Sequence, residues 1–357
     1  MLKNTVPVAL LLSLAVPALA QTGGQEKFKF SLDAFYRQEW TNDIPETLAA
    51  ANPDSRWRIQ ARPRIDVNLG SVAFGVGAEF NYSKDENVEP PPALLRDNYD
   101  SKDARVDLAY LALKPSDWLV LEGGRIEMPA GLTEMVWDKD LRPQGGALTL
   151  QKIDSAGTRR FGLTGLWSKG SHVFDDEDVT MWLASLELGL SQSLSVTGSY
   201  LQWDDPTALE PMLRRQNRRV GALFLNEYKV VDVVGRLFRE GDVELQLVAD
   251  YCWNTEADDQ NKGLWLAAVL GSTRTSRGRL EYTYAKVDRD ATLGAYAADD
   301  FFWTTGWEGH RLDLGIAVGK NAAIHGTAQR QRFKDSPVVE DQDDWITRYR
   351  VDLRVFY

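Results

Sequence analysis

Residues 56–70 hold the densest group of side chains in the sequence that could do chemistry. The stretch RWRIQARPRIDVNLG places Arg56, Arg58, Arg62 and Arg64 at positions of one parity, and apolar residues occupy most of the others. Guanidinium groups bind carboxylates and phosphates through paired, charge-assisted hydrogen bonds. A period of two puts successive side chains on opposite faces of a β-strand. The stretch therefore predicts a strand with one basic face and one apolar face.

The charge of the whole chain argues against nucleic acid as the partner of this basic face. The 357 residues carry a formal net charge of −11, and an acidic chain is a poor general binder of nucleic acid. The one cysteine, Cys252, excludes an intramolecular disulfide. We expect no nucleic-acid partner.

The N-terminus has the three-part pattern of an export signal. A positively charged MLKN precedes the apolar run VPVALLLSLAVPALA, which ends in the small-x-small pattern Ala18-Leu19-Ala20. Residues 1–20 are therefore predicted to be a cleaved signal peptide. Residues 21–357 are predicted to form one domain.

Alternation of apolar and polar residues recurs along the rest of the chain, in segments of about ten residues separated by turn signals. Short turns alternate with long polar loops. We expect sixteen strands, near 27–40, 55–69, 72–83, 103–113, 118–126, 146–154, 158–168, 178–190, 193–203, 229–239, 243–254, 262–271, 277–288, 308–319, 322–333 and 344–357. An even count returns the chain to its starting side, so residues 218–227 are assigned to a long loop with room for a short helix. Fourteen or eighteen strands stay open.

The strands have the features of a membrane-spanning barrel rather than of a soluble sandwich. After the signal no apolar run is long enough for a transmembrane helix. Several apolar faces begin or end in Trp or Tyr, including Trp40, Tyr82 and Trp118, as expected where a lipid-facing band meets headgroups. The predicted fold is an all-β, transmembrane, antiparallel up-and-down barrel. A barrel of this size leaves an aqueous channel.

The last residues carry a first resemblance. TRYRVDLRVFY alternates strictly and ends on an aromatic residue, and it resembles the C-terminal targeting strand of bacterial outer-membrane barrels, which usually ends in Phe. The resemblance implies location in the bacterial outer membrane. It also implies recognition of the C-terminal strand by the barrel-assembly machinery.

The segment between the fifth and sixth strands carries a second resemblance. Alternation breaks in residues 123–146, where prolines and glycines argue against a regular strand. The runs GRIEMPAG and VWDKDLRPQG resemble a motif of the bacterial putative-porin family. In sixteen-stranded porins this third loop folds into the lumen and narrows it, which implies a constriction. The candidate residues are Glu134, Asp138, Lys139, Asp140 and Arg142.

The resemblance also implies a function and partners. It points to a homotrimer in contact with outer-membrane lipid and lipopolysaccharide, which passes small hydrophilic solutes and ions by passive diffusion. Two alternatives stay open. One is a channel selective for sugars, phosphate or carboxylates, and the other is a non-conducting structural or adhesive barrel.

Closure of the barrel would place the last strand beside the first and gather one basic wall. Arginine facing lipid costs a few kcal/mol at the midplane, so these side chains are expected to face the lumen. The wall consists of Lys29, Arg37, Arg56, Arg58, Arg62, Arg64, Arg348, Arg350 and Arg354. One hypothesis is an electric field between this wall and an acidic loop, and the other is internal charge pairing that stiffens the barrel. Pro63 removes a backbone donor, which predicts an irregularity there.

Motifs for catalysis are absent from the sequence. It contains neither HExxH nor GxSxG, and no histidine lies near Cys252. We expect neither an enzyme nor a cofactor. The acidic runs at 175–178 and 341–344 could bind calcium, although solvated loops are the simpler interpretation.

Overall fold

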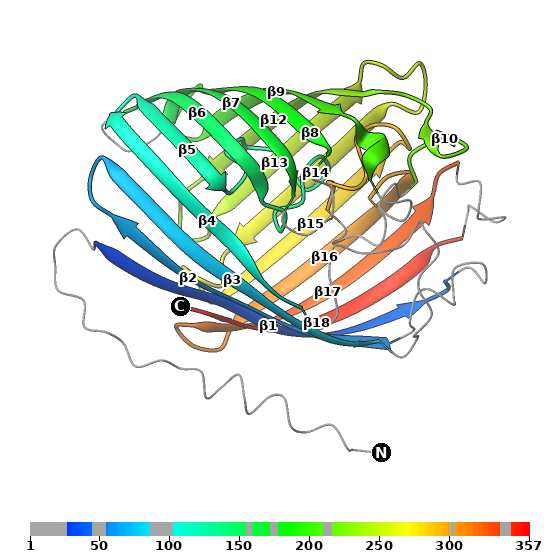
Figure 1. The fold of residues 1–357 in the computed structure, drawn as a ribbon. Helices are drawn as coiled ribbons and strands as arrows, with labels where there is room; N and C mark the ends of the chain where they lie inside the picture. The colour runs from blue at the N-terminus through cyan, green and yellow to red at the C-terminus, as the bar shows by residue number, and fades with distance from the viewer. Residues whose placement is uncertain are drawn as a thin grey trace.

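Sixteen strands form a closed antiparallel barrel (Figure 1). The computed structural model describes residues 27–44, 55–85, 103–154, 159–171, 178–209, 216–298, 300, 304–335 and 344–357. The barrel strands are β1 Phe28–Asn42, β2 Ser55–Asn68, β3 Val72–Asp85, β4 Asp103–Ser116, β5 Leu119–Arg125, β6 Pro143–Ile153, β7 Arg159–Ser171, β8 Thr180–Gly189, β9 Leu194–Asp204, β12 Tyr228–Arg239, β13 Leu245–Asn254, β14 Lys262–Gly271, β15 Gly278–Val287, β16 Trp307–Ala317, β17 Ala322–Phe333 and β18 Ile346–Phe356. The predicted sixteen-stranded barrel is confirmed.

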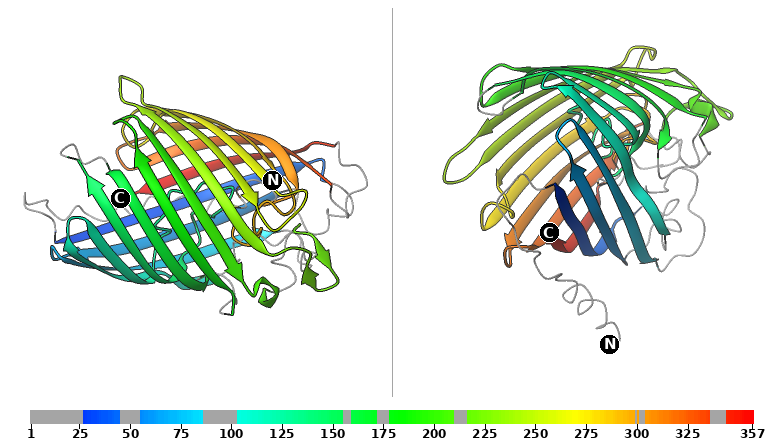
Figure 2. Two further views of the ribbon diagram at one scale, coloured as in Figure 1. Left: turned by 90° about the horizontal axis from the view of Figure 1, so that it is seen from above. Right: turned by 60° about the vertical axis from the view of Figure 1, so that its left-hand side comes forward.

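The barrel closes between its first and last strands. β18 pairs with β1 from Asp33–Phe356 to Asn42–Thr347, and β2 pairs with the other edge of β1. The strands are tilted against the barrel axis (Figure 2), as closure requires. β18, β1 and β2 are therefore neighbours, and their inward residues share one part of the inner wall. The predicted signal peptide, residues 1–20, lies outside the described residues.

Residues 218–227 lie outside the barrel, as expected. They form a small hairpin of β10 Arg219–Val220 and β11 Leu223–Phe224 rather than a helix. The short 3₁₀ helix η1, Pro206–Ala208, precedes them in the same connection between β9 and β12. The buried carboxylate of Asp290 holds this connection, because it accepts hydrogen bonds from Arg218 Nε at 2.6 Å and the Tyr228 hydroxyl at 3.0 Å.

The two faces of the strands differ as the alternation predicts. Along β16, Leu312, Leu314 and Ile316 are 42%, 53% and 64% exposed on the outer face, whereas their neighbour Arg311 is buried inside. Aromatic residues near strand ends, such as Trp40 and Trp118, are also exposed. An outer apolar surface flanked by aromatic residues matches a lipid environment. No described helix is long and apolar enough to cross a membrane.

The irregularity expected at Pro63 is present. Pairing of β2 with β3 runs to Ala61–Phe80, is interrupted at Arg62 and Pro63, and resumes in the same register at Arg64–Gly77. The next pair of strands contains a bulge beside this point, because Gly77 pairs with Leu108 and Ala78 with Val106. Asp107 is the extra residue, and its side chain is buried.

The expectation that residues 123–146 hold no regular strand is wrong at both ends. β5 extends through Gly123 and Gly124, and β6 starts at Pro143 and contains Gly145 and Gly146. Glycine suits this place because the backbones approach closely. A Cβ on Gly145 would lie 1.9 Å from the carbonyl oxygen of Trp167, and Gly124 has a φ of +116°. The irregular segment is shorter than predicted and covers residues 126–142.

Candidate functional site

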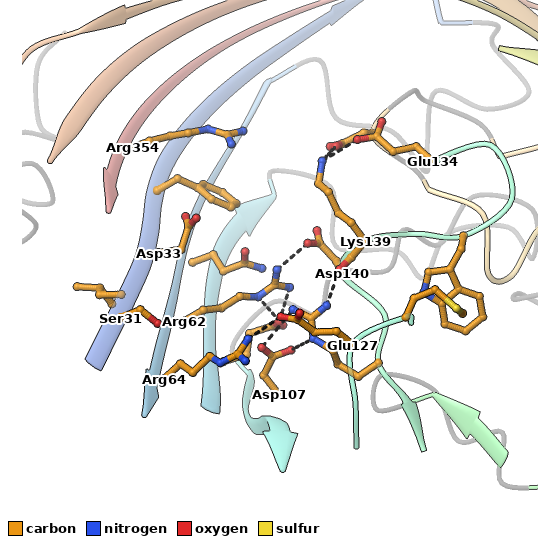
Figure 3. A pocket seen from close by; sticks show the side chains of 18 of the residues that line it. Ser31, Asp33, Arg62, Arg64, Asp107, Glu127, Glu134, Lys139, Asp140 and Arg354 are labelled. Atoms are coloured by element: carbon orange, nitrogen blue, oxygen red, sulfur yellow. Dashed lines mark hydrogen bonds and ion pairs between the residues drawn. The ribbon is translucent and has the colours of Figure 1, made fainter. Parts of the chain in front are cut away.

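Side chains of β1, β2 and β18 meet those of residues 126–142 around one cavity. The cavity measures about 720 Å³, and a second cavity of about 270 Å³ adjoins it. Figure 3 shows Arg62, Arg64 and Arg354 on the strand side and Glu127, Glu134, Lys139 and Asp140 on the other. Of the predicted basic wall, the larger cavity is lined by Lys29, Arg37, Arg58, Arg62, Arg64 and Arg354. Arg350 lines the smaller cavity.

One carboxylate, that of Glu39, lies close to four arginines of the wall. Glu39, 2% exposed, lies 3.0 Å from Arg56 Nε, 2.9 Å from Arg58 Nε and 2.8 Å from Arg350 Nε. Arg348 Nη1 is more distant, at 3.8 Å. The pairing across β2, β1 and β18 brings these residues together, since Arg56 and Arg350 are the strand partners of Glu39 on either side.

A second carboxylate binds two further arginines of the wall. Asp352 accepts two hydrogen bonds of 2.8 Å from Arg37, in bidentate geometry, and two from Arg354, of 2.9 and 3.3 Å. Bidentate pairs fix both position and orientation. Much of the basic wall is therefore neutralised within the barrel, as the charge-pairing hypothesis requires.

Arg62 and Arg64 connect the wall to the segment 126–142. Arg62 Nη1 lies 2.6 Å from Asp140 Oδ1, and its Nε donates to Glu79 at 2.7 Å. Arg64 Nη1 lies 2.5 Å from Glu127 Oε1. The hypothesis of an electric field across an open gap between the basic wall and the loop does not hold at Arg62 and Asp140, because these two side chains are in direct contact.

The far side of the same segment contacts other strands. Glu134 lies 2.9 Å from Arg311 of β16 and accepts a hydrogen bond of 2.8 Å from Lys139. The Thr133 hydroxyl donates to Asp250 of β13. Residues 126–142 are thus held by ion pairs and hydrogen bonds to β2, β13 and β16, which are separated around the barrel.

Asp300, from the connection between β15 and β16, occupies the centre of the charged cluster. Its carboxylate lies 2.8 Å from Lys139 Nζ, 3.4 Å from Arg350 Nη1 and 3.7 Å from Arg37 Nη1. Burial raises the pKa of Asp300, but Lys139, Arg37 and Arg350 outweigh it, so its pKa lies well below the ordinary value. Asp300, Lys139, Glu134 and Arg37 line both cavities and mark where they meet.

The other loop ionisations follow the same balance of burial and charge. Burial raises the pKa of Asp140, but Arg62 and Lys139 together lower it by more, so the net shift is downward. The pKa of Glu134 is lowered by Arg311 and Lys139 against the opposing effect of burial. Removal from water lowers the pKa of Lys139, but Asp300 and Glu134 raise it above its ordinary value. All four groups are therefore charged at neutral pH.

Asp138 and Arg142 have a different position from the other loop candidates. Asp138 is 3% exposed and lines neither cavity; its backbone N–H donates to Tyr296 O at 2.7 Å, and its Oδ1 accepts from Asp140 N at 2.8 Å. Arg142 lines the larger cavity and lies 3.2 Å from the bulged Asp107. Asp138 therefore shapes the backbone that presents Lys139 and Asp140.

Aromatic packing holds the segment against the connection between β15 and β16. The rings of Trp137 and Tyr296 are stacked, with centroids 5.5 Å apart and an interplanar angle of 7°. The Trp203 ring also stacks with Tyr296, at a centroid distance of 6.1 Å. Trp137, Leu141 and Leu293 are buried. The first part of the long connection between β15 and β16 is therefore packed rather than exposed.

Sequence reasoning missed several charged residues of the site. Glu79 and Glu281 occupy the polar faces of predicted strands, so alternation already placed them inward, but nothing indicated their partners. Asp107 faces inward through the bulge beside Pro63. Asp300 had no signal, because its position depends on how the connection between β15 and β16 packs.

The described lining of the cavities has more basic than acidic side chains. Nine lysines and arginines and seven carboxylates line the larger cavity. Seven arginines and lysines and five carboxylates line the smaller one. The lining is therefore net basic in a chain whose net charge is −11. Such a lining attracts anions and repels cations.

Metal binding finds no site among the described residues. They contain no group of three or more His, Cys, Asp or Glu arranged to hold a metal ion. Most of the acidic runs at 175–178 and 341–344, where calcium binding was considered, lies outside the described residues.

Comparison with known proteins agrees with this architecture. The structure resembles that of Pseudomonas putida OprB, with a TM-score of 0.64 and 12% identity over 93% of this chain and 94% of that chain. It also resembles a triple mutant of the Rhodopseudomonas blastica porin, with a TM-score of 0.52 and 9% identity over 92% of this chain and 100% of that one. No curated protein matches the sequence. The model of the family described as "Putative porin" matches residues 17–195. The chain belongs to the putative porin family and has the sixteen-stranded barrel of an outer-membrane channel.

Proposed function

We propose that the barrel is a water-filled pore through which small hydrophilic solutes and ions diffuse passively, with a preference for anions. The observation that carries this proposal is the charged cavity between the inner wall and residues 126–142, whose lining has an excess of basic groups. A wide barrel cannot fill its interior with side chains, so water and solutes have a path.

The constriction belongs to the same proposal. Residues 126–142 fold into the lumen, and Lys139 and Asp300 stand at its narrowest part, where the two cavities meet. Contacts of this segment with β2, β13 and β16 support such a position. A ring of charged side chains at a narrow point sets ion preference.

Conductance of the purified protein in planar bilayers tests the pore. We expect stepwise conductance that rises with salt without saturation, and a reversal potential in a KCl gradient that indicates chloride preference. A barrel that never conducts would instead support a structural or adhesive role. A cation-selective reversal potential would contradict the assigned preference.

A solute-selective channel is the second candidate, for phosphate or carboxylate solutes. It is favoured by the guanidinium and ammonium groups that line the larger cavity, since planar guanidinium forks match these anions. Block of the current by micromolar phosphate or a dicarboxylate would favour this candidate over general diffusion. Block only at concentrations where salt itself screens the pore would exclude it.

Assembly and biogenesis are proposed on family resemblance. A homotrimer is expected, and mass measurement of the detergent-solubilised protein by light scattering tests it. Recognition of β18 by the barrel-assembly machinery would require its terminal aromatic residue. Tyr357→Ser, which leaves no aromatic residue at the final position, should then reduce the amount of folded barrel in the outer membrane.

A further inference from the structure

Two arginines lie on the outer, otherwise apolar surface of the barrel. Arg330 and Arg332 of β17 have the same parity as the exposed Ile324, and their strand partners on β16, His310 and Glu308, continue the exposed face of that strand. Arg330 is exposed, and no ion pair with a described carboxylate is found for it. Arginine on this surface is costly at the bilayer midplane and tolerated near the headgroups. We therefore expect these arginines to lie at headgroup depth and to interact with polar groups of the membrane there.

A tryptophan organises this basic cluster. The guanidinium carbons of Arg330 and Arg332 lie 5.1 and 5.0 Å from the centre of the Trp345 ring. The His310 ring is 5.8 Å from Trp345, and its Nδ1 is 2.8 Å from the Tyr282 hydroxyl. Cation–π contacts hold the two guanidinium groups in place, and a planar guanidinium carries several N–H donors that can bind more than one acceptor.

The cluster carries a net positive charge. Arg332 pairs with Glu308, and the exposed Lys286 stands directly opposite Glu308 on β15. Among the described residues, Arg330, Arg332 and Lys286 thus surround the one carboxylate of Glu308. The cluster lies near the ends of its strands toward the long connections, because β17 ends at Phe333, three residues after Arg330.

An apolar groove begins at this cluster. It has a volume of about 660 Å³ and is lined by His310 and Tyr284 at one end and by Gly235, Ala249 and Leu266 at the other. The small side chains hollow the outer surface. A Cβ on Gly235 would have no atom closer than 3.8 Å.

Strand register shows that groove and cluster form one feature. Gly235 pairs with Ala249, Ala249 with Leu266, Leu266 with Tyr284, Tyr284 with His310, and His310 with Arg330. This row crosses five strand spacings of about 4.8 Å, and with a tilt of about 40° it climbs about 15 Å along the barrel axis. On β12 the row lies nearer the short-turn end, and on β17 nearer the long connections. The groove therefore rises from the apolar band to the basic cluster.

We propose that this feature is a binding site for one anionic membrane lipid whose headgroup carries phosphate with a net negative charge. The phosphate binds Arg330, Arg332 and Lys286, and an acyl chain fills the groove over Gly235 and Ala249. Charge complementarity selects a phosphate-bearing anionic lipid over a neutral one. The site lies on the opposite side of the barrel wall from the proposed pore, so it is independent of solute passage.

Native mass spectrometry of the detergent-solubilised protein with added lipid A tests the headgroup half. We expect retained lipid A, little retained phosphatidylcholine, and about thirtyfold weaker lipid A binding after the double change Arg330→Gln and Arg332→Gln, at about tenfold per 1.4 kcal/mol and about 1 kcal/mol per basic residue. Arg277→Gln, an exposed arginine in a short turn, is the matched control and should bind like the unmodified protein. Equal retention of phosphatidylcholine, or unchanged binding in the double variant, would overturn the proposal.

The groove has its own matched pair of variants. Gly235→Leu fills it, whereas Gly165→Leu places the same side chain where a Cβ meets nothing within 4 Å on the distant β7. We expect reduced lipid A binding in Gly235→Leu and unchanged lipid A binding in Gly165→Leu. Resistance to unfolding in SDS without heating shows that both barrels are folded. Unchanged binding in Gly235→Leu would overturn the proposal. Complete release by inorganic phosphate alone would do the same, because the site would then hold a free anion.

Discussion

The contact between Asp140 and Arg62 should hold the segment 126–142 against the barrel wall. Replacement of Asp140 by Asn removes the charge that Arg62 Nη1 meets at 2.6 Å. Arg62 keeps Glu79, to which its Nε donates at 2.7 Å, so no buried charge is left alone. The backbone N–H of Asp140 still donates to Asp138. The change is therefore specific for the tether.

The magnitude follows from distance and exposure. Two unit charges at about 4 Å interact by about 4 kcal/mol at an effective dielectric constant of about 20. The Asp140 side chain is 41% exposed, so water screens most of this energy and leaves about 1 kcal/mol. Since 1.4 kcal/mol is a factor of ten, the fraction of time that the segment is released should rise about fivefold.

Single-channel recording in planar bilayers measures this fraction. We expect the fraction of recording time that the channel spends in states of altered conductance to be about five times larger in Asp140→Asn than in the unmodified protein. The variant should also be more anion-selective, because a negative charge is lost. Asp117→Asn, in an exposed short turn, is the control. Arg62→Gln completes a double-mutant cycle, which isolates the pair energy. Gating that is the same in Asp140→Asn and the unmodified protein would refute the tether.

Three further predictions test the wall, the loop charges and the barrel backbone. Glu39→Gln should destabilise the barrel by about 1.5–3 kcal/mol, because it removes the buried charge that Arg56, Arg58 and Arg350 share; urea unfolding measures this, and a change below about 0.5 kcal/mol would contradict it. The lowered pKa values of Glu134, Asp140 and Asp300 mean that their ion pairs are complete above the ordinary pKa of about 4 and are lost only as pH falls below it. These three groups should therefore leave the reversal potential unchanged from pH 7 to 5, and a titration step in that window that Asp140→Asn removes would disprove the assignment. Gly145→Ala should lower the yield of folded barrel, because its Cβ would lie 1.9 Å from Trp167 O, while Gly146→Ala, with its nearest atom at 3.6 Å, should fold normally; equal yields would contradict the packing.

Local sequence patterns predicted most of the barrel strands but few of the ion pairs between them. Alternation along residues 308–319 placed Leu312 and Leu314 outside and Arg311 inside, because a strand exposes its two faces with a strict period of two. Closure then made the last strand a neighbour of the first, which gathered Arg37, Arg58 and Arg350 on one wall. That Glu39 would collect several of them depends on register across three strands.

The positions of side chains in the segment 126–142 could be predicted only in part from the sequence. Its motif indicated Lys139 and Asp140, and both line the larger cavity. Asp138 has the same residue type as Asp140 but is buried, because its neighbour Trp137 packs on Tyr296. Asp300 contributes from a connection about 160 residues later in the chain. Contacts between irregular segments depend on tertiary packing, and no local period encodes them.

A charged label introduced at position 139 is the most direct test of whether residues 126–142 stand in the permeation path. The native Cys252 is buried, so a thiol introduced by Lys139→Cys should be the one that reacts with a small charged thiosulfonate. We expect labelling of Lys139→Cys to reduce single-channel conductance, and labelling of Ile316→Cys, 64% exposed on the outer face, to leave it unchanged. A Lys139→Cys pore whose conductance and ion preference do not change after complete labelling would contradict this expectation.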